Sequence, residues 1–318
     1  MSEGTALQEY GFRREREALF PPMVVMEITN VCNLQCIHCP HVVISKQENY
    51  TPAHMSWEIF VKVVEEVSGY KGTIFRLLSD GEPLMHPRFL EMLTFAKEKG
   101  ITPVNFITNG MRLDEAMAKR ILELGVEAVE VSLDAMHKKT YEKIRKGGNY
   151  DLVTANLHRF IELRNNMRAG TKIMVSIIDQ PEAEAEIEEF EKYWNGKADR
   201  VIKRVYTSIR GLVDEKKMKI SSRGKRWPCP QLWNRIFISV DGKVEFCVED
   251  WHDKTVIGDI RNTALKEIWC SSEYNELRRL HLDREFRRIP YCRNCKDWKA
   301  REWGNDYFYA LEQVLKNE

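Results

Sequence analysis

Apolar runs and amphipathic segments alternate along the first two thirds of the chain. Six apolar runs, several of them rich in β-branched and aromatic residues, predict strands at residues 23–29, 73–78, 103–108, 128–133, 172–178 and 200–205. The segments between them repeat apolar positions every three or four residues and predict helices at residues 57–67, 88–99, 114–124, 152–164 and 183–193. Strands that alternate with helices over short connections predict a parallel α/β sheet with its helices outside.

Polar motifs follow four of the predicted strands. They begin at Cys32 after the first strand, and they occupy residues 80–83, 108–110 and 132–134 after the second, third and fourth. The carboxyl ends of parallel strands meet at one edge of a sheet, where such folds place their chemistry. We therefore expect these residues to form one site. The pattern alone fits a closed barrel and an open curved sheet equally well.

The composition changes after the sixth predicted strand. Residues 214–226 are rich in lysine, arginine and serine and predict a linker. Apolar runs on both sides of Asp241-Gly242 predict a β-hairpin over residues 236–247, and helical patterns follow at residues 262–280 and 303–315. We expect an N-terminal segment (1–20), a large α/β domain (21–213), the linker (214–226) and a small α+β domain with the hairpin (227–318).

The charge balance argues against several classes of function. The 318 residues include 49 basic and 48 acidic side chains, which give a net charge of +1. Such a chain has no overall field to attract nucleic acid or a membrane surface. The polar N-terminus lacks the apolar core of a signal peptide, and no apolar run approaches the length of a membrane span. We expect a cytoplasmic protein with no nucleic-acid or membrane partner.

Three closely spaced cysteines give the strongest chemical signal. Cys32, Cys36 and Cys39 form a Cys-x3-Cys-x2-Cys motif just after the first predicted strand. Thiolates hold iron–sulfur clusters, and a four-iron cube held by three thiolates keeps one iron open for a ligand that is not protein. The alternative interpretations are three unrelated buried cysteines, or part of a structural zinc site, although zinc usually takes four protein ligands.

A second set of cysteines lies in the C-terminal part of the chain. It consists of Cys229, Cys247, Cys292 and Cys295. Four thiolates drawn from separate segments suit a tetrahedral zinc site and a fully ligated four-iron cluster equally well. Cys270 is left over from both sets.

These motifs together resemble the radical S-adenosylmethionine (SAM) superfamily. The resemblance rests on the first three cysteines and on Asp80-Gly81-Glu82-Pro83, Thr108-Asn109-Gly110 and Ser132-Leu133-Asp134 in that order. The C-terminal part resembles a SPASM domain through Cys229-Pro230-Gln231-Leu232-Trp233, Val240-Asp241-Gly242-Lys243-Val244, Gly258-Asp259-Ile260, Glu267-Ile268-Trp269 and Cys292-Arg293-Asn294-Cys295. No cysteine follows Cys295, so the shorter twitch version with one auxiliary cluster is expected. The resemblance implies an α/β fold, an open partial (β/α)6 TIM-like barrel followed by a small α+β SPASM/twitch domain.

The resemblance also implies roles for individual residues. Cys32, Cys36 and Cys39 would hold a [4Fe-4S] cluster that binds SAM, and Cys229, Cys247, Cys292 and Cys295 would hold an auxiliary [4Fe-4S] cluster. The expected SAM contacts are His38, Gly81, Glu82, Asn109, Ser132, Asp134 and Arg145. Glu82 would accept from the SAM ammonium group, Gly81 would let the backbone come close, and Arg145 would face the SAM carboxylate. Asp80 stands where the family usually has the first glycine of Gly-Gly-Glu-Pro, which puts that position in doubt.

The implied reaction is reductive cleavage of SAM to methionine and a 5′-deoxyadenosyl radical, which removes a hydrogen atom from a substrate. A donor such as flavodoxin or ferredoxin would supply the electron. The auxiliary cluster would take an electron from the substrate radical in a dehydrogenation, hold a hydrogen donor in place or be structural. Cys270 would donate a hydrogen atom in an epimerisation, or would be only a small residue packed on a helix face.

Few residues precede the first predicted strand, too few for a separate domain that recognises a leader peptide. We therefore expect a polar small-molecule substrate of the amino sugar or cyclitol type, in natural-product or carbohydrate biosynthesis. The first alternative is a peptide-modifying enzyme of the same superfamily. The second, from another class, is a non-catalytic iron–sulfur or zinc-binding protein.

Overall fold

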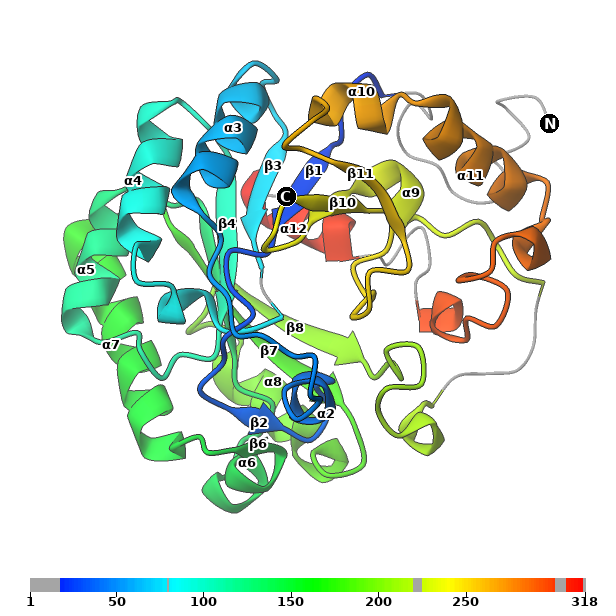
Figure 1. Ribbon diagram of the computed structural model, residues 1–318. Coiled ribbons are helices and arrows are strands. Elements are labelled where there is room, and N and C mark those ends of the chain that lie inside the picture. Colours follow the sequence, from blue (N-terminus) through cyan, green and yellow to red (C-terminus); the bar gives the residue numbers. More distant parts are fainter. Residues whose placement is uncertain (1–17, 79, 220–224, 301–306, 317–318) are drawn as a thin grey trace.

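The main sheet has nine strands in the order β11-β10-β9-β1-β3-β4-β5-β7-β8 (Figure 1). The computed structural model describes residues 18–78, 80–219, 225–300 and 307–316. Six parallel strands coincide with the six predicted runs: β1 Met23–Met26, β3 Ile74–Leu77, β4 Val104–Thr108, β5 Ala128–Ser132, β7 Lys172–Asp179 and β8 Arg200–Val205. The predicted parallel α/β sheet is confirmed.

Amphipathic helices cover the outer face of the six parallel strands. The five predicted helices are present as α3 Trp57–Ser68, α4 Phe89–Glu98, α5 Glu115–Glu123, α7 Tyr150–Met167 and α8 Ile187–Trp194, and Figure 1 shows α3, α4, α5 and α7 along the outside of the sheet. Phe60 and Phe160 on these helices pack with alternate strand residues such as Val24 and Phe106 into the larger apolar core. None of the helices in the described ranges combines the length and apolar character of a membrane span.

Shorter elements that the hydrophobic pattern did not predict complete the described chain. They are β2 Gln35–Cys36, β6 Arg145–Lys146, β11 Val256–Asp259, the helices α2 His41–Ile44, α6 Lys138–Ile144 and α9 Gln231–Asn234, and 3-10 turns at Pro83–Met85, Glu184–Glu186, Glu215–Lys217, Phe286–Arg288 and Asp297–Ala300. Each is too short to show a helical or strand period in the sequence.

The predicted β-hairpin extends the main sheet. β9 (Ile236–Ile238) and β10 (Lys243–Glu245) pair antiparallel, and Gly242 in the turn has a φ of 86°, which glycine adopts without strain. β9 also pairs in parallel with β1, which places Ile238 opposite Met26. One sheet therefore joins the two predicted domains, whose boundaries stay a prediction.

One of the two predicted C-terminal helices differs from the observed structure. Residues 262–280 form two helices, α10 Leu265–Trp269 and α11 Ser272–Leu282, so the prediction of one helix is wrong. The break falls at Ser271, whose extended backbone and hydroxyl, which accepts from the Tyr274 amide, begin a new helix. The last helix, α12, spans Tyr307–Lys316, and residues 303–306 of its predicted range lie outside the described residues.

The concave face of the sheet is filled at its amino end. Phe308, Leu311 and Val314 of α12 pack there against inward strand residues such as Met23 and Val25. Because α12 fills this end, the open space on the concave face lies toward the carboxyl ends of the strands, where the polar motifs are.

Pairing of β9 with β1 gives a prediction for stability. Ile238 is 0% exposed, so Ile238→Ala should lower the free energy of unfolding by about 2–5 kcal/mol, the range for large-to-small changes in a packed core. Val256→Ala on β11 is a matched control, because Val256 is 39% exposed and surface changes usually cost about 0.5 kcal/mol or less. Urea denaturation of the two variants under equal cofactor loading measures both values, and equal losses would contradict the packing described.

Candidate functional site

The three N-terminal cysteines lie together at the carboxyl end of β1. Cys32, Cys36 and Cys39 line one cavity of about 510 Å³, called here the cluster cavity. A short antiparallel pairing between distant parts of the chain holds their loop, because β2 pairs with β6 and places Cys36 opposite Arg145. The structure thus brings the three predicted ligands to one space.

Burial disfavours the ionised, thiolate form of these cysteines unless a cation binds to them. They are free thiols, and burial raises the pKa of Cys32 to about 11 and also raises the pKa values of Cys36 and Cys39. For Cys32 and Cys39 neighbouring thiolates add to the shift, because like charges repel. Bound iron reverses this cost, since a coordinated thiol is deprotonated. The donor set therefore fits an iron–sulfur cluster.

In the described part of the chain, no three His, Cys, Asp or Glu side chains are grouped closely enough to hold one ion. A four-iron cube makes a different demand, because each thiolate binds its own iron. Three thiols on one loop match that demand.

Glu82 is fixed in a buried position beside the cysteine loop. Its Oε1 accepts from the Thr108 hydroxyl (2.6 Å) and the Leu84 amide (3.2 Å), and its Oε2 accepts from the Asn109 amide (2.7 Å). Burial raises the pKa of Glu82, although these hydrogen bonds oppose the shift. A carboxylate has about four lone-pair sites, so one stays available for a cationic ligand.

Close approach of two backbones requires glycine at position 81. The Gly81 amide donates to the Thr29 carbonyl (3.3 Å), and the Glu82 amide donates to the Val31 carbonyl (2.8 Å). A Cβ on Gly81 would lie 2.2 Å from the Val31 carbonyl oxygen. Glycine therefore lets the loop that carries Glu82 lie directly against the loop that carries the cysteines.

Asp134 and Arg145 form a buried ion pair behind the cluster cavity. Arg145 donates to Asp134 Oδ2 from Nε (2.9 Å) and Nη2 (2.6 Å), and the Ile178 amide donates to Oδ1 (2.9 Å). His38 Nε2 lies 3.5 Å from Asp134 Oδ2. Burial lowers the pKa of His38 to about 4, so its ring is neutral near pH 7.

The predicted SAM contacts divide into two groups. Six of them line the cluster cavity: His38, Gly81, Glu82, Asn109, Ser132 and Arg145. Asp134 is 1% exposed and does not line it, and its carboxylate holds Arg145, whose Nη1 lies 4.0 Å from Cys36 Sγ. The roles of all seven toward SAM stay predictions.

Two arginines that the motif reasoning missed, Arg76 and Arg204, line the cavity, and we call them and the buried Glu130 that they contact the charged floor. Glu130 of β5 is 0% exposed and accepts from Arg204 Nη2 through both oxygens (2.6 and 2.8 Å), and Arg76 Nη2 lies 3.8 Å from it. Tyr206 also lines the cavity, and its buried hydroxyl has no hydrogen-bond partner among the described residues. A charged residue inside an apolar strand, such as Arg76 in β3, was the sequence signal that could have found this floor.

The four C-terminal cysteines also come together. Cys229, Cys247, Cys292 and Cys295 line a second, small cavity. Burial, with the neighbouring Cys229 and Cys295 thiolates, raises the pKa of Cys292 to about 12. Cations lie beside this thiol set, since Arg210 and Arg226 line the same cavity. The four thiols therefore fit a site for a metal cluster.

Cys270 lies apart from both cysteine sets. It follows α10, is exposed, and its Sγ lies 3.5 Å from the Leu19 carbonyl oxygen. It lines neither the cluster cavity nor the cavity of the auxiliary cysteines. A hydrogen-atom donor must reach the substrate, so the structure gives this hypothesis no support.

Two family models match the chain. The model of the radical SAM superfamily matches residues 26–193, just over half of the chain, and the SPASM model, described as an iron–sulfur cluster-binding domain, matches residues 229–296. Among curated proteins, Fe-coproporphyrin III synthase of Methanosarcina barkeri is 33% identical over 156 residues, which cover 49% of this chain and 37% of that protein. The chain spans less than half the length of this and other curated relatives that it matches.

Solved structures share the fold at low sequence identity. BtrN in complex with AdoMet and 2-DOIA is 18% identical with a TM-score of 0.60, over 87% of this chain and 93% of that chain. Streptococcus suis SuiB bound to precursor peptide SuiA is 14% identical with a TM-score of 0.69, over 97% of this chain and 75% of that chain. The fold therefore occurs in proteins that bind a small molecule and in one that binds a peptide.

The contact at Gly81 yields a test of the site. Gly81→Ala must move the two loops apart by about 1 Å, and such displacements cost about 100-fold in rate. We expect that loss in 5′-deoxyadenosine formation from SAM, with less iron bound. Gly170→Ala is the matched control, because no atom lies within 4 Å of a Cβ there. If both variants formed 5′-deoxyadenosine at the wild-type rate, the close approach would have no functional role.

Proposed function

The chain belongs to the radical SAM superfamily, and we propose that it cleaves SAM reductively and removes a hydrogen atom from a polar small molecule of the amino sugar or cyclitol type. The family carries a [4Fe-4S] cluster and SAM, and the SPASM match adds a second iron–sulfur site. The observation that carries the proposal is the cluster cavity itself. It brings three free thiols, a buried glutamate with a lone pair to spare and a charged floor into one space.

We assign the cofactors to particular residues. Cys32, Cys36 and Cys39 hold the SAM-binding cluster, and Glu82 accepts from the SAM ammonium group. When bound, this cluster supplies the electron that splits SAM into methionine and a 5′-deoxyadenosyl radical. The residues around the cluster position the site: Gly81 sets the distance between the two loops, and Asp134 fixes Arg145 at the cavity wall.

The charged floor supports a polar small-molecule substrate. Arg76, Arg204, Lys203 and Arg235 all line the cluster cavity, and such cationic donors bind hydroxyl or carboxylate substituents better than apolar ones. The match to BtrN covers 93% of the BtrN chain, and the BtrN structure contains the small molecule 2-DOIA. The likeness to SuiB, solved with a precursor peptide, is the observation that keeps a peptide-modifying enzyme as the second candidate.

Oxidation is the outcome that we propose for the substrate. An auxiliary cluster held by Cys229, Cys247, Cys292 and Cys295 offers an electron acceptor when bound, and Glu249 lines both this cavity and the cluster cavity. Epimerisation has less support, because Cys270, its candidate hydrogen donor, lines neither the cluster cavity nor the cavity of the auxiliary cysteines. The eight free thiols suit a reducing compartment, so we also propose a cytoplasmic location and a flavodoxin or ferredoxin as electron donor.

The first test is SAM cleavage. Protein reconstituted anaerobically and given dithionite and SAM should form 5′-deoxyadenosine, whereas a non-catalytic metal protein should not. Glu82→Gln should weaken SAM binding by about tenfold or more, the scale of one charge-assisted hydrogen bond. Glu276→Gln, at an exposed glutamate on α11 that pairs with Arg279, is the control. Unchanged SAM affinity in Glu82→Gln would remove the role assigned to Glu82.

A second test concerns Cys270. Because its thiol is exposed, iodoacetamide should alkylate it in the cluster-loaded protein at the same rate with and without SAM. Mass spectrometry of the labelled peptide follows the reaction, and Cys270→Ala serves as the unlabelled control. Protection by SAM would place Cys270 beside the cofactor and revive hydrogen donation.

A further inference from the structure

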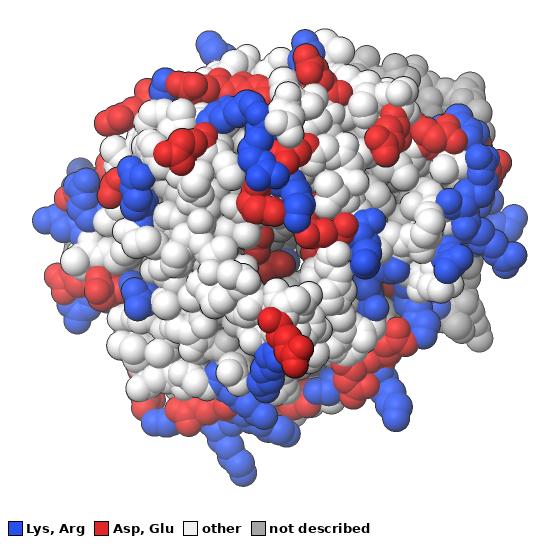
Figure 2. Space-filling model, viewed as in Figure 1, with Lys and Arg blue, Asp and Glu red and all other residues white. Residues whose placement is uncertain are grey.

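A third cavity, distinct from that of the auxiliary cysteines, lies beside the cluster cavity, and its walls are acidic. It has a volume of about 520 Å³ and forms where residues 47–53, after the cysteine loop, face the hairpin of β9 and β10. Asp80 and Trp251 line both cavities, so the two spaces adjoin. Figure 2 shows acidic side chains gathered around the hollow in the middle of this face. We call this third space the acidic cavity.

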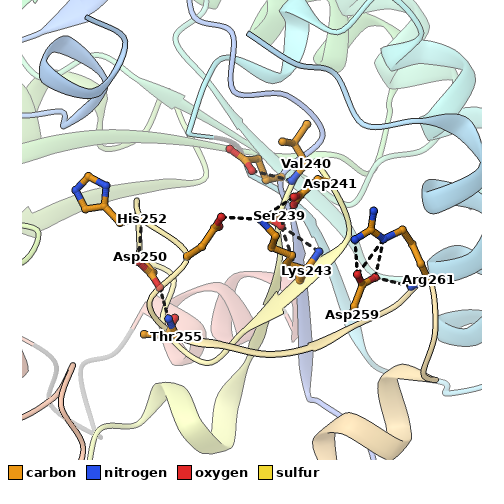
Figure 3. Close-up of polar contacts among 11 residues, drawn as sticks. Ser239, Val240, Asp241, Lys243, Asp250, His252, Thr255, Asp259 and Arg261 are labelled. Atoms are coloured by element: carbon orange, nitrogen blue, oxygen red, sulfur yellow. Dashed lines mark hydrogen bonds and ion pairs between the residues drawn. The ribbon is translucent and has the colours of Figure 1, made fainter. Parts of the chain in front are cut away.

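Six carboxylates line the acidic cavity, and only two of them are neutralised by a lysine. Lys243 Nζ lies 2.9 Å from Asp241 Oδ2 and 2.6 Å from Asp253 Oδ2, and Figure 3 shows Lys243 beside Asp241 at the hairpin. The other four are Glu27, Asp80, Glu245 and Asp250. Within the described ranges no lysine or arginine forms an ion pair with any of these four.

Two of the four carboxylates have hydrogen-bond donors from the backbone. Glu27 Oε2 accepts from the Val240 amide (2.8 Å). Asp250 accepts from the amides of His252 (3.0 Å) and Thr255, as Figure 3 shows. Amides orient a carboxylate but bring no full positive charge, so they do not replace an ion pair.

Glu245 is a buried carboxylate that its protein neighbours leave incompletely satisfied. It is 2% exposed, lines the acidic cavity, and its Oε2 has no hydrogen-bond partner among the residues that the structure describes. Leaving a buried carboxylate uncompensated is costly. Elsewhere the same chain avoids that cost, because the fully buried Glu130 is matched by Arg204 and Arg76. Burial also raises the pKa of Glu27 to about 7, with Asp241 and Asp253 adding to the shift, as expected where a cation is missing.

An organic cation fits this arrangement better than a metal ion. A divalent cation needs several oxygens that converge on one point, and no described group of three His, Cys, Asp or Glu side chains does so. A primary ammonium group instead donates three hydrogen bonds in separate directions. Aromatic side chains suit a cation as well, and Tyr50 and Trp251 line the same walls.

We propose that the acidic cavity binds the primary ammonium group of an amine substrate, while the carbon that loses its hydrogen atom lies in the adjoining cluster cavity. Asp80, at the first position of its motif, stands at the junction and contributes its carboxylate to the ammonium site. This proposal rests on the proposed function and narrows its substrate to an amine. It also gives Asp80, the departure from the family's motif, a role in recognition of the substrate.

Calorimetric titration of the reconstituted, SAM-bound full-length protein with n-propylammonium tests the proposal, with n-propanol as the neutral probe of similar shape. We expect millimolar binding of the ammonium probe and none of the alcohol. Glu245→Gln and Glu27→Gln keep the shape of the cavity, and each should lower the affinity for the ammonium probe by about tenfold. Asp259→Asn is the matched control, because Asp259, the last residue of β11, pairs with Arg261 in the turn that follows (Figure 3) and does not line the cavity.

Several outcomes would overturn the ammonium site. They are equal binding of n-propanol, equal weakening in Asp259→Asn, displacement of the probe by Mg²⁺ or Mn²⁺ at stoichiometric concentration, and no detectable binding of the probe. The assay for 5′-deoxyadenosine, run on the same preparation without any amine, reports separately on the proposed function. SAM cleavage without ammonium binding would overturn only the acidic-cavity proposal, and the reverse result would overturn only SAM cleavage.

A second pair of probes separates the two sources of a primary ammonium group. Glucosamine represents an amino sugar, and Nα-acetyl-lysine amide represents a lysine in a peptide; N-acetylglucosamine is the neutral control. Preference for glucosamine that is lost in Glu245→Gln supports an amino sugar type of substrate. Preference for the lysine derivative that is also lost in Glu245→Gln supports the ammonium site but overturns the small-molecule part of the proposed function.

Discussion

Parallel pairing of β1 on both of its edges is the constraint on which both cavities depend. β1 lies between β3 and β9, and its four residues are at most 1% exposed. Just beyond its carboxyl end, the Glu27 amide donates to the Ile238 carbonyl (2.8 Å) and the Glu27 carboxylate accepts from the Val240 amide (2.8 Å). The chain then continues to Cys32. A single strand end therefore positions the cysteine loop on one side and the wall of the acidic cavity on the other.

The extent to which buried charges are paired changes along the concave face of the sheet. Apolar residues of α12 fill the amino end of the sheet, where an unpaired charge would be most costly. Glu130, Arg204 and Arg76 form a compensated layer above them. Toward the open end, Glu82 accepts three hydrogen bonds and forms no ion pair within the described residues, and Glu245 has an oxygen with no donor in the same part of the chain. Compensation thus decreases where a ligand would enter, as expected when the ligand supplies the missing charge.

The fold by itself does not select a substrate, since BtrN and SuiB share it while their structures contain a small molecule and a peptide. What selects the substrate is the chemistry of the walls. Here a charged floor, an adjoining acidic cavity and the shared residues Asp80 and Trp251 describe a ligand with polar groups at fixed separation. Glu249 also lines the cavity of the auxiliary cysteines, so the sites that we propose for oxidation and recognition lie in neighbouring cavities.

Local patterns in the sequence determined the six parallel strands, the five outer helices, the hairpin and both cysteine sets, because periodicity, turn residues and motif spacing are properties of short segments. They did not reveal the break at Ser271, since a serine that caps a new helix looks like any polar residue in a continuing one. Nor did they reveal that β9 would join β1, that Arg145 would be held by Asp134, that Cys270 would lie apart, or that Glu27, Asp80, Glu245 and Asp250 would share one cavity. These facts depend on contacts between residues far apart in the chain, and only the packing of the whole sheet brings such residues together.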